Sequence, residues 1–246
     1  MKLSAASQKK LMLGIVAAGA VAVLASRAVR PAAVPMRSSP ALPVVTLPAG
    51  PTTPTRPTPA PAGPTRAQLI DRCEQAILKE VPLRRLSPVA TRTLALQLVT
   101  VCEEEGYPLD LAFGHAYAES ALDLNAVNRS SGAAGPLQVT KIAADQVGAA
   151  WPLTTPAAKV RAGIRYMKWA RSAYPECAAS VRETLRHYGM GRGNWLNYRR
   201  GELTCATSLS VTRAELGCPG TRPYSATVIA IAQRHPELRT TSWWGS

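Results

Sequence analysis

The residue pattern with the clearest chemical meaning in this chain contains one glutamate followed by a glycine-rich turn. Glu119 and Ser120 stand next to each other, and the sequence Gly-Ala-Ala-Gly-Pro-Leu-Gln begins thirteen residues after Glu119. A glutamate can act as a general acid that protonates a leaving oxygen. Glycines let the backbone approach a ligand closely. The pattern therefore indicates acid catalysis beside a glycine-rich binding surface.

The residues before Glu119 predict a helix that begins after Pro108 and ends near Ser120. Leu109, Phe113 and Ala116 fall near one face of that helix, and Glu119 lies in its last turn. Apolar neighbours and the negative end of the helix dipole both disfavour a charged carboxylate, as suits a general acid. The alternative is a surface glutamate that ends an ordinary helix.

The order of these motifs resembles the Slt-type lytic transglycosylases, the lysozyme-like enzymes that cut peptidoglycan. The Glu-Ser pair, the segment Asn-Ala-Val-Asn at 125–128 and the glycine turn carry the resemblance, which extends over about residues 68–235. It implies a mostly α-helical, lysozyme-like (SLT) domain.

The resemblance assigns the catalytic role to Glu119 and an orienting role to Ser120. In this family one glutamate protonates the bond between N-acetylmuramic acid and N-acetylglucosamine. It then acts as a base on the C6 hydroxyl, which yields a 1,6-anhydromuramoyl end without water. The N-acetyl group of the substrate replaces the second carboxylate that most glycosidases use. Asp123, one helical turn after Glu119, is the candidate for a second carboxylate, but it is expected to be a solvated or capping residue. No cofactor is implied.

The resemblance also implies a set of substrate-binding residues. Gly132, Gly135 and Gln138 match the turn and the glutamine that line the sugar groove. Tyr188 matches a tyrosine close to the catalytic glutamate. Tyr224 matches a late tyrosine of the final helix, and a plain core position is its alternative.

Three departures from the family pattern affect the expected site. Pro136 and Leu137 replace the usual Leu-Met before the glutamine. Gly189 stands where the family has an asparagine, which puts one hydrogen bond to substrate in doubt. His115, one turn before Glu119, replaces an aliphatic residue. It either tunes Glu119 or packs as an ordinary histidine.

Motifs and charge exclude several other classes of protein. The chain has no His-Glu-x-x-His, phosphate-loop or Gly-x-Ser-x-Gly sequence, so no metal site is expected. The net charge of +14 lies mostly in residues 1–66, which hold eight basic and no acidic residues. The rest shows no basic stripe with interleaved aromatics, so nucleic-acid binding is not expected. A basic front end suits an anionic membrane surface.

Residues 1–30 are expected to direct export of the chain, and residues 31–64 to act as a spacer between the membrane and the folded domain. Residues 1–30 contain an uncharged run from Leu11 to Ala25, which suits either a membrane anchor or a signal peptide cleaved after Ala25. Residues 31–64 hold eleven prolines and no aromatic or acidic residue, which predicts a disordered linker. At ~3.1 Å per residue its reach approaches roughly 100 Å.

Helix signals occupy the predicted domain, residues 65–239, which is followed by a tail at 240–246. Thr65 and Gln68 form a capping-box pattern. Alternating strand patterns are missing, so the domain is predicted to be mostly α-helical. Further helices are expected to begin at Ser87-Pro88, Pro108, Thr140 and Thr155-Pro156, and to span about Ala178–His187 and Tyr224–Arg234. Trp243 and Trp244 in the tail either pack on the domain or contact a membrane or partner.

The five cysteines fit no zinc-binding spacing. In an exported protein, disulfides Cys73–Cys102 and Cys205–Cys218 are both plausible pairings. Buried free cysteines are the alternative for each, and at least one thiol is left over.

The resemblance, together with the expected export segment, implies a peptidoglycan lytic transglycosylase that opens the cell wall locally for secretion, conjugation or phage entry. Its partners would be glycan strands and, through residues 1–30, a membrane. The expected location is the inner membrane with the domain in the periplasm, a phage virion membrane, or a cleaved secreted form. The alternatives are a goose-type muramidase that hydrolyses the same bond and a non-catalytic wall-binding or virion structural protein.

Overall fold

The computed structural model describes residues 63–81, 87–208 and 210–243. The predicted membrane segment at 1–30, the linker up to residue 62 and Trp244 lie outside the described residues. Within the described ranges, none of the helices combines the length and apolar character needed to cross a membrane. The described helices belong to one unit that contains residues 64–246.

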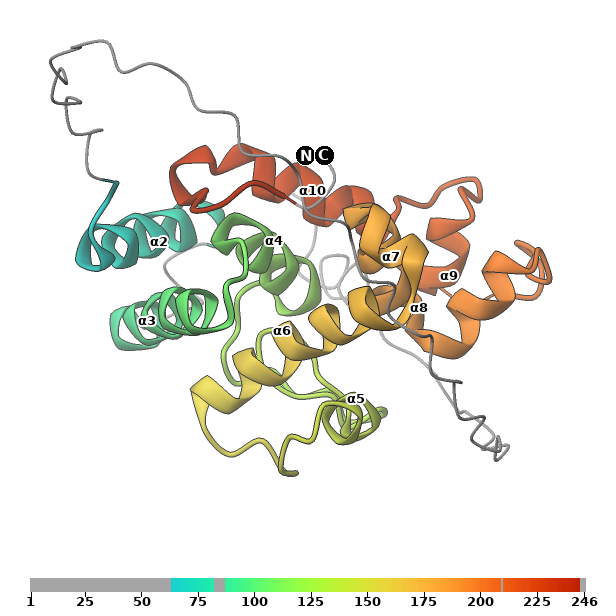
Figure 1. The fold of residues 1–246 in the computed structure, drawn as a ribbon, viewed down its shortest axis with the longest axis horizontal. Helices are drawn as coiled ribbons and strands as arrows, with labels where there is room; N and C mark the ends of the chain where they lie inside the picture. Colours follow the sequence, from blue (N-terminus) through green and yellow to red (C-terminus); the bar gives the residue numbers. More distant parts are fainter. Residues whose placement is uncertain (1–62, 82–86, 209, 244–246) are drawn as a thin grey trace, which may run out of the picture. The chain divides into compact units, whose positions relative to one another are not determined.

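The described part of the chain is mostly helical and contains no strand, which confirms that prediction. In chain order the elements are α2 (Arg66–Glu80), α3 (Pro88–Glu105), α4 (Leu109–Ser120), α5 (Lys141–Gln146), α6 (Pro156–Ala173), α7 (Pro175–Ala179), α8 (Val181–Arg199), α9 (Ser210–Glu215), α10 (Tyr224–Arg234) and the short 3-10 helix η2 (Pro236–Leu238) (Figure 1).

Side-chain caps fix where several of these helices begin. Thr65 and Gln68 form the predicted capping box of α2, with the Gln68 Oε1 accepting from the Thr65 amide at 2.8 Å. Ser87, Thr140 and Thr155 cap α3, α5 and α6 by accepting from an amide three residues on. The predicted starts of these four helices are confirmed.

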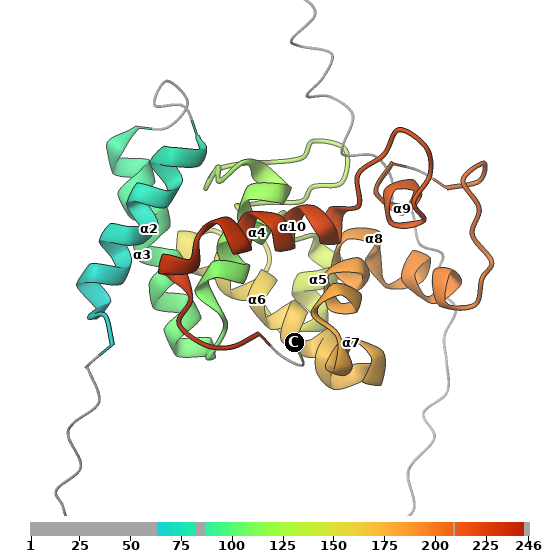
Figure 2. The same cartoon turned by 90° about the horizontal axis from the view of Figure 1, so that it is seen from above.

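Helix α4 lies in the core, and its residues from Leu109 to Ala116 are all buried. Helix α10 crosses it closely, as Figure 2 shows. Gly114 makes this approach possible, because a Cβ there would lie 2.5 Å from the Val228 carbonyl oxygen. Helices α2, α3 and α6 complete the main apolar cluster around α4. The last turn of α4, which carries Glu119, is thereby held by packing on several sides.

The predicted helix at Ala178–His187 was wrong at both ends. Ser180 has extended backbone angles (φ −146°, ψ 123°) and its side chain caps the Glu183 amide, so α7 ends before it and α8 begins after it. Helix α8 continues past His187 to Arg199, with a kink at Gly191 (φ 73°, ψ 154°). Helix α9 was not predicted at all.

The C-terminal tail returns to the start of α4. The Asp110 carboxylate is fully buried, and one of its oxygens accepts from Arg239 Nε and Trp243 Nε1, each at 2.9 Å. The Arg239 guanidinium also lies 5.1 Å from the centroid of the Trp243 ring. For Trp243, packing on the domain is the correct alternative.

The cysteines divide into one disulfide and three buried thiols. Cys205 and Cys218 form the predicted disulfide, with their Cα atoms 5.7 Å apart. Cys73 and Cys102 are not bonded, so that pairing was wrong. Each fills a buried position between helices as a small apolar residue does. Burial also raises the pKa of Cys73 to about 12, which keeps its thiol protonated.

Candidate active site

Glu119 lies at the point where α4 ends and the chain turns sharply. Its side chain is 18% exposed, so the carboxylate is largely shielded from solvent yet reachable. Ala121 (φ 53°) and Leu122 (φ 65°) both adopt the left-handed backbone conformation, which is uncommon for residues other than glycine. Leu122 is fully buried, which helps to hold this turn. Backbone strain of this kind is common at functional sites.

His115 lies one turn before Glu119 and faces it. The His115 Nε2 is 3.7 Å from Glu119 Oε1, and the His115 side chain is only 2% exposed. Its ring meets the Tyr188 ring edge-on, with centroids 4.1 Å apart. Among the described residues, Nε2 has no hydrogen-bond partner. His115 is therefore a packed histidine whose Nε2 atom faces the Glu119 carboxylate.

Two tyrosines flank the same carboxylate. Burial, followed by the charge of Glu119, raises the pKa of both Tyr188 and Tyr224 well above the usual value. The Tyr188 hydroxyl donates to the Leu137 carbonyl oxygen at 2.6 Å. The Tyr224 hydroxyl is buried and has no hydrogen-bond partner of normal geometry among the described residues. The Glu119 carboxylate is near enough to act as an acceptor for this hydroxyl, which also raises the pKa of Tyr224.

Ser120 connects the end of α4 to the glycine turn. Its hydroxyl lies 3.0 Å from both the Ala116 and Pro136 carbonyl oxygens, and its oxygen accepts from the Asp123 amide at 3.1 Å. These contacts fix the position of the backbone that carries Glu119. Ser120 thus ties the end of α4, next to Glu119, to the glycine turn.

The glycine turn depends on its predicted residues for its shape. Gly132 (φ 72°) and Gly135 (φ 77°) have left-handed backbones, and a Cβ at Gly135 would lie 2.6 Å from the Lys159 Cβ. Gln138 donates from Nε2 to the carbonyl oxygens of Gly135 at 2.9 Å and Ala126 at 3.3 Å. The Gln138 side chain therefore stabilises the turn through hydrogen bonds to two backbone carbonyl groups.

The structure gives a reason for glycine at position 189. A Cβ on Gly189 would lie 2.6 Å from Cδ1 of Tyr224. The Tyr224 ring thus occupies the space that an asparagine side chain would enter. This close packing brings the segment with Tyr188 against the start of α10.

Two other acids near the ends of α4, Asp123 and Asp110, do not join Glu119. Asp123 is exposed, and its Oδ1 accepts from the Asn125 amide at 2.8 Å, as expected for a solvated or capping residue. Asp110 binds the C-terminal tail at the opposite end of α4, about 14 Å away at 1.5 Å per residue. Within the described ranges, no cluster of His, Cys, Asp or Glu is arranged to hold a metal ion.

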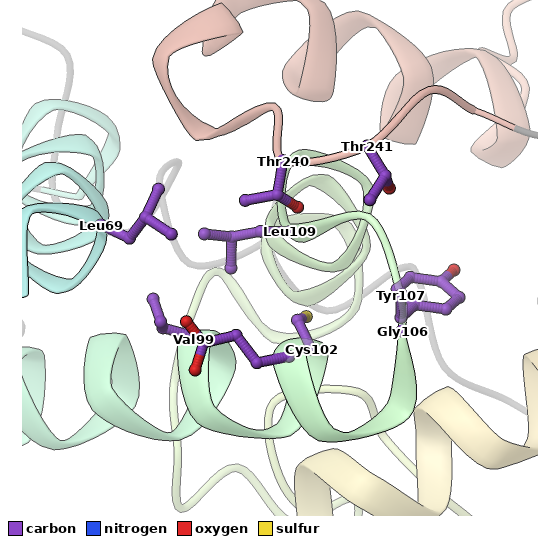
Figure 3. A pocket seen from close by; sticks show the side chains of 9 residues that line it. Leu69, Val99, Cys102, Gly106, Tyr107, Leu109, Thr240 and Thr241 are labelled. Atoms are coloured by element: carbon purple, nitrogen blue, oxygen red, sulfur yellow. The ribbon is translucent and has the colours of Figure 1, made fainter. Parts of the chain in front are cut away.

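Two cavities lie elsewhere in the described part of the molecule. One of about 170 Å³ is bounded by Leu69, Val99, Leu109 and the tail residues Thr240 and Thr241 (Figure 3). Leu109 begins α4, so this cavity is near the end of the helix opposite Glu119. The other is bounded by Gly106 and residues of the last turns of α6. Neither contributes to the surroundings of Glu119.

No sequence signal indicates the polar network that joins α8, α9 and α10. Arg186, Glu215 and Ser225 form it, and they are separated by 29 and 10 residues along the chain. No local spacing rule relates such positions. Only the packing of α9 between α8 and α10 brings them together.

Comparison with known proteins gave no match: no protein-family model, no curated protein and no solved structure matches this chain.

Proposed function

We propose that this chain is a peptidoglycan lytic transglycosylase with a lysozyme-like helical domain, and that Glu119 is its catalytic acid and base. One observation carries the proposal. Glu119 is a partly shielded carboxylate that is flanked by Tyr188 and Tyr224 and joined through Ser120 to the glycine turn. Residues that resemble one family in sequence thus also meet in space.

The proposed reaction uses one carboxyl group in two steps. Protonated Glu119 gives its proton to the glycosidic oxygen, and the bond from that oxygen to C1 of the muramoyl sugar breaks. The N-acetyl oxygen of the same sugar bonds to C1 and stabilises the positive charge. The Glu119 carboxylate then takes the proton of the C6 hydroxyl as O6 attacks C1, which releases the N-acetyl oxygen. The carboxyl group is restored and a 1,6-anhydro ring is formed.

The tyrosines surround the reacting carboxyl group as neutral phenols. Their raised pKa keeps both phenols protonated at neutral pH, so neither competes with Glu119 as a base. The Tyr188 hydroxyl donates to Leu137, whereas the buried Tyr224 hydroxyl has no other hydrogen-bond partner among the described residues and is left to donate to Glu119. Gly132, Gly135 and Gln138 would present the turn to the glycan strand.

We place the protein in the cell envelope, anchored by residues 1–30 with the domain in the periplasm or on a phage virion membrane. The Cys205–Cys218 disulfide supports this, because disulfides persist in oxidising compartments. The anchored enzyme would open peptidoglycan for a secretion, conjugation or phage apparatus.

The substitution Glu119→Gln tests the assignment. It removes the transferable proton at nearly constant shape, so clearing of purified sacculi should fall by about 10²–10⁴-fold. Glu104→Gln, at an exposed glutamate of α3, is the matched control and should keep full activity. Circular dichroism checks that both variants fold. Clearing by Glu119→Gln at the wild-type rate would show that another residue is the acid.

A further inference from the structure

The loop between α8 and α10 is fixed to itself at its base. The Cys205–Cys218 disulfide closes the loop, and Arg213 on α9 donates to the Cys205 carbonyl oxygen. Helix α9 within the loop contacts both α8 and α10. The loop therefore holds α9 in one place relative to two helices that carry site residues.

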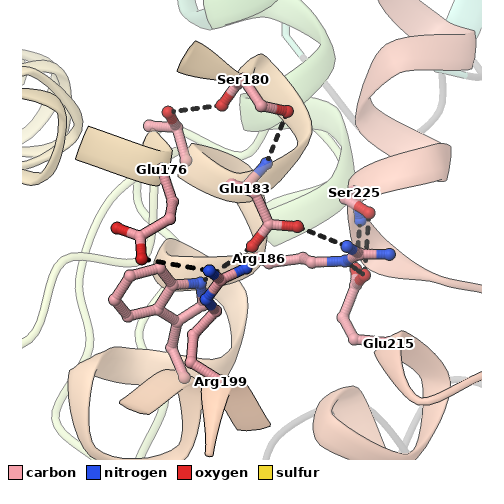
Figure 4. A network of polar contacts seen from close by, with 9 residues as sticks. Glu176, Ser180, Glu183, Arg186, Arg199, Glu215 and Ser225 are labelled. Carbon is pink, nitrogen blue, oxygen red and sulfur yellow. Dashed lines mark hydrogen bonds and ion pairs between the residues drawn. The ribbon is translucent and has the colours of Figure 1, made fainter. Parts of the chain in front are cut away.

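Glu215, the last residue of α9, makes polar contacts with both α8 and α10. Its side chain is fully buried, and its carboxylate accepts from the Ser225 amide at 2.5 Å, the Ser225 hydroxyl at 2.8 Å and Arg186 Nε at 3.0 Å (Figure 4). Arg186 is held in turn by Glu183. This buried carboxylate thus has three charge-assisted hydrogen bonds.

These bonds satisfy the start of α10, which lacks a cap of its own. Pro223 precedes the helix and offers no side-chain hydrogen bond. The amides of a first helical turn have no partner within the helix, and a negative charge there is favoured by the dipole. Glu215 supplies both the acceptor and the charge from outside the helix.

The anchored segments are the ones that carry the two tyrosines. Tyr224 directly precedes Ser225, and Tyr188 lies two residues after Arg186. The Tyr224 ring packs against Gly189 at the same junction. One carboxylate therefore connects both tyrosine-bearing segments that flank Glu119.

We propose that Glu215 is a positioning residue that holds Tyr224 against Glu119, and that the Cys205–Cys218 disulfide keeps Glu215 in place. The site is then fully assembled only in the oxidised protein. A dithiol reductant supplies two electrons and two protons to the disulfide, giving two thiols and the cyclic disulfide of the reagent. The effect on turnover rests on the proposed function, whereas the effect on Tyr224 does not.

The test compares Glu215→Gln, Ser225→Ala and the reduced wild-type protein with untreated wild type. Carbon-13 labelled tyrosine reports the Tyr224 ring by NMR, assigned by the loss of its signal in Tyr224→Phe. Glu176→Gln, which breaks an exposed ion pair with Arg199 on the side of the network away from Glu215 in Figure 4, is the matched control. Thermal unfolding shows whether each protein is folded at the temperature used.

We expect the Tyr224 signal to shift or broaden in Glu215→Gln and on reduction, to change less in Ser225→Ala, and to stay unchanged in Glu176→Gln. The kcat for wall cleavage should fall about 10- to 100-fold in Glu215→Gln with little change in KM. Glu215→Asp, which keeps the charge, should recover part of the loss.

An unchanged Tyr224 signal in folded Glu215→Gln and in reduced protein would overturn the inference. Should Glu215→Gln not fold, Ser225→Ala and the reduced protein decide the matter. If the wild-type protein fails to cleave peptidoglycan while the Tyr224 signal still moves, the proposed function is wrong and the positioning role stands.

Discussion

Single residues explain both what the site needs and where it departs from the family it resembles. At position 189 the chain has no side chain because the Tyr224 ring occupies that space. This close contact holds the Tyr224 ring against the segment that carries Tyr188. His115 adds an imidazole where an aliphatic residue would only pack.

The substitution Gly189→Asn restores the family residue and should be harmful here. The new Cβ would overlap Tyr224, and forced overpacking costs about 1–3 kcal/mol. Urea unfolding and sacculus clearing should both decline. Gly193→Asn is the control on the same helix, since nothing lies within 4 Å of a Cβ there. Equal stability of the two variants would contradict this account of Gly189.

His187 should make the fold sensitive to mild acid. It is fully buried among the rings of Tyr166, Trp169, Tyr174 and Trp195. Burial, followed by the charge of Arg192, lowers its pKa from 6.5 to about 4. The unfolded chain therefore binds the proton first, and stability is lost as the pH falls from 6.5 towards 4. At about 1.4 kcal/mol per pKa unit, the loss is about 3 kcal/mol.

Urea unfolding at pH 7, 5.5 and 4 measures this loss. His187→Phe keeps a ring in the aromatic surroundings and removes the titrating group, so its stability should fall less over the same range. Other acid-sensitive contacts, such as that of Glu80 with His235, are common to both proteins and cancel in the comparison. Parallel curves for the two proteins would show that His187 is not responsible.

At the scale of elements, α4 is held at both ends by different means. Ser120 ties its C-terminal end to the glycine turn, and Asp110 ties its first turn to the tail. A carboxylate in the first turn also matches the helix dipole. Glu119 is thus carried by a helix that is fixed from both directions.

The link between α4 and the tail can be measured with a double-mutant cycle. Trp243→Phe removes a donor to the buried Asp110 and should cost about 1–3 kcal/mol in unfolding free energy. In the Asp110→Asn background the same change should cost less, because the charged acceptor is gone. Additive effects of the two substitutions would mean that the contact contributes nothing to stability.

Helix boundaries followed from the sequence where a cap or a proline marks them. Thr65, Ser87, Thr140 and Thr155 each identified a helix start because capping is a local interaction. Ser180 is a cap of the same kind, yet it was assigned to a helix interior. Helix α9 has few signals of its own, since its position depends on the disulfide and on Glu215.

The same distinction holds for the site as a whole. Glu119, Ser120 and the glycine turn were found from local order along the chain, and the structure brings them together. The placement of Tyr188 and Tyr224 beside Glu119 depended on the resemblance, because single tyrosines carry little information. Glu215 could not be found by either route, since its partners are distant in sequence and its role arises from packing.

The whole molecule is proposed to cleave a glycan strand with one carboxyl group and without water. Mass spectrometry of the soluble fragments released from purified sacculi tests this directly. We expect fragments that end in 1,6-anhydromuramoyl residues, lighter by one water than their hydrolysed counterparts. Fragments with reducing ends would instead indicate a muramidase. Binding to sacculi without release of fragments would indicate a non-catalytic protein. Either result would contradict the proposed transglycosylase reaction.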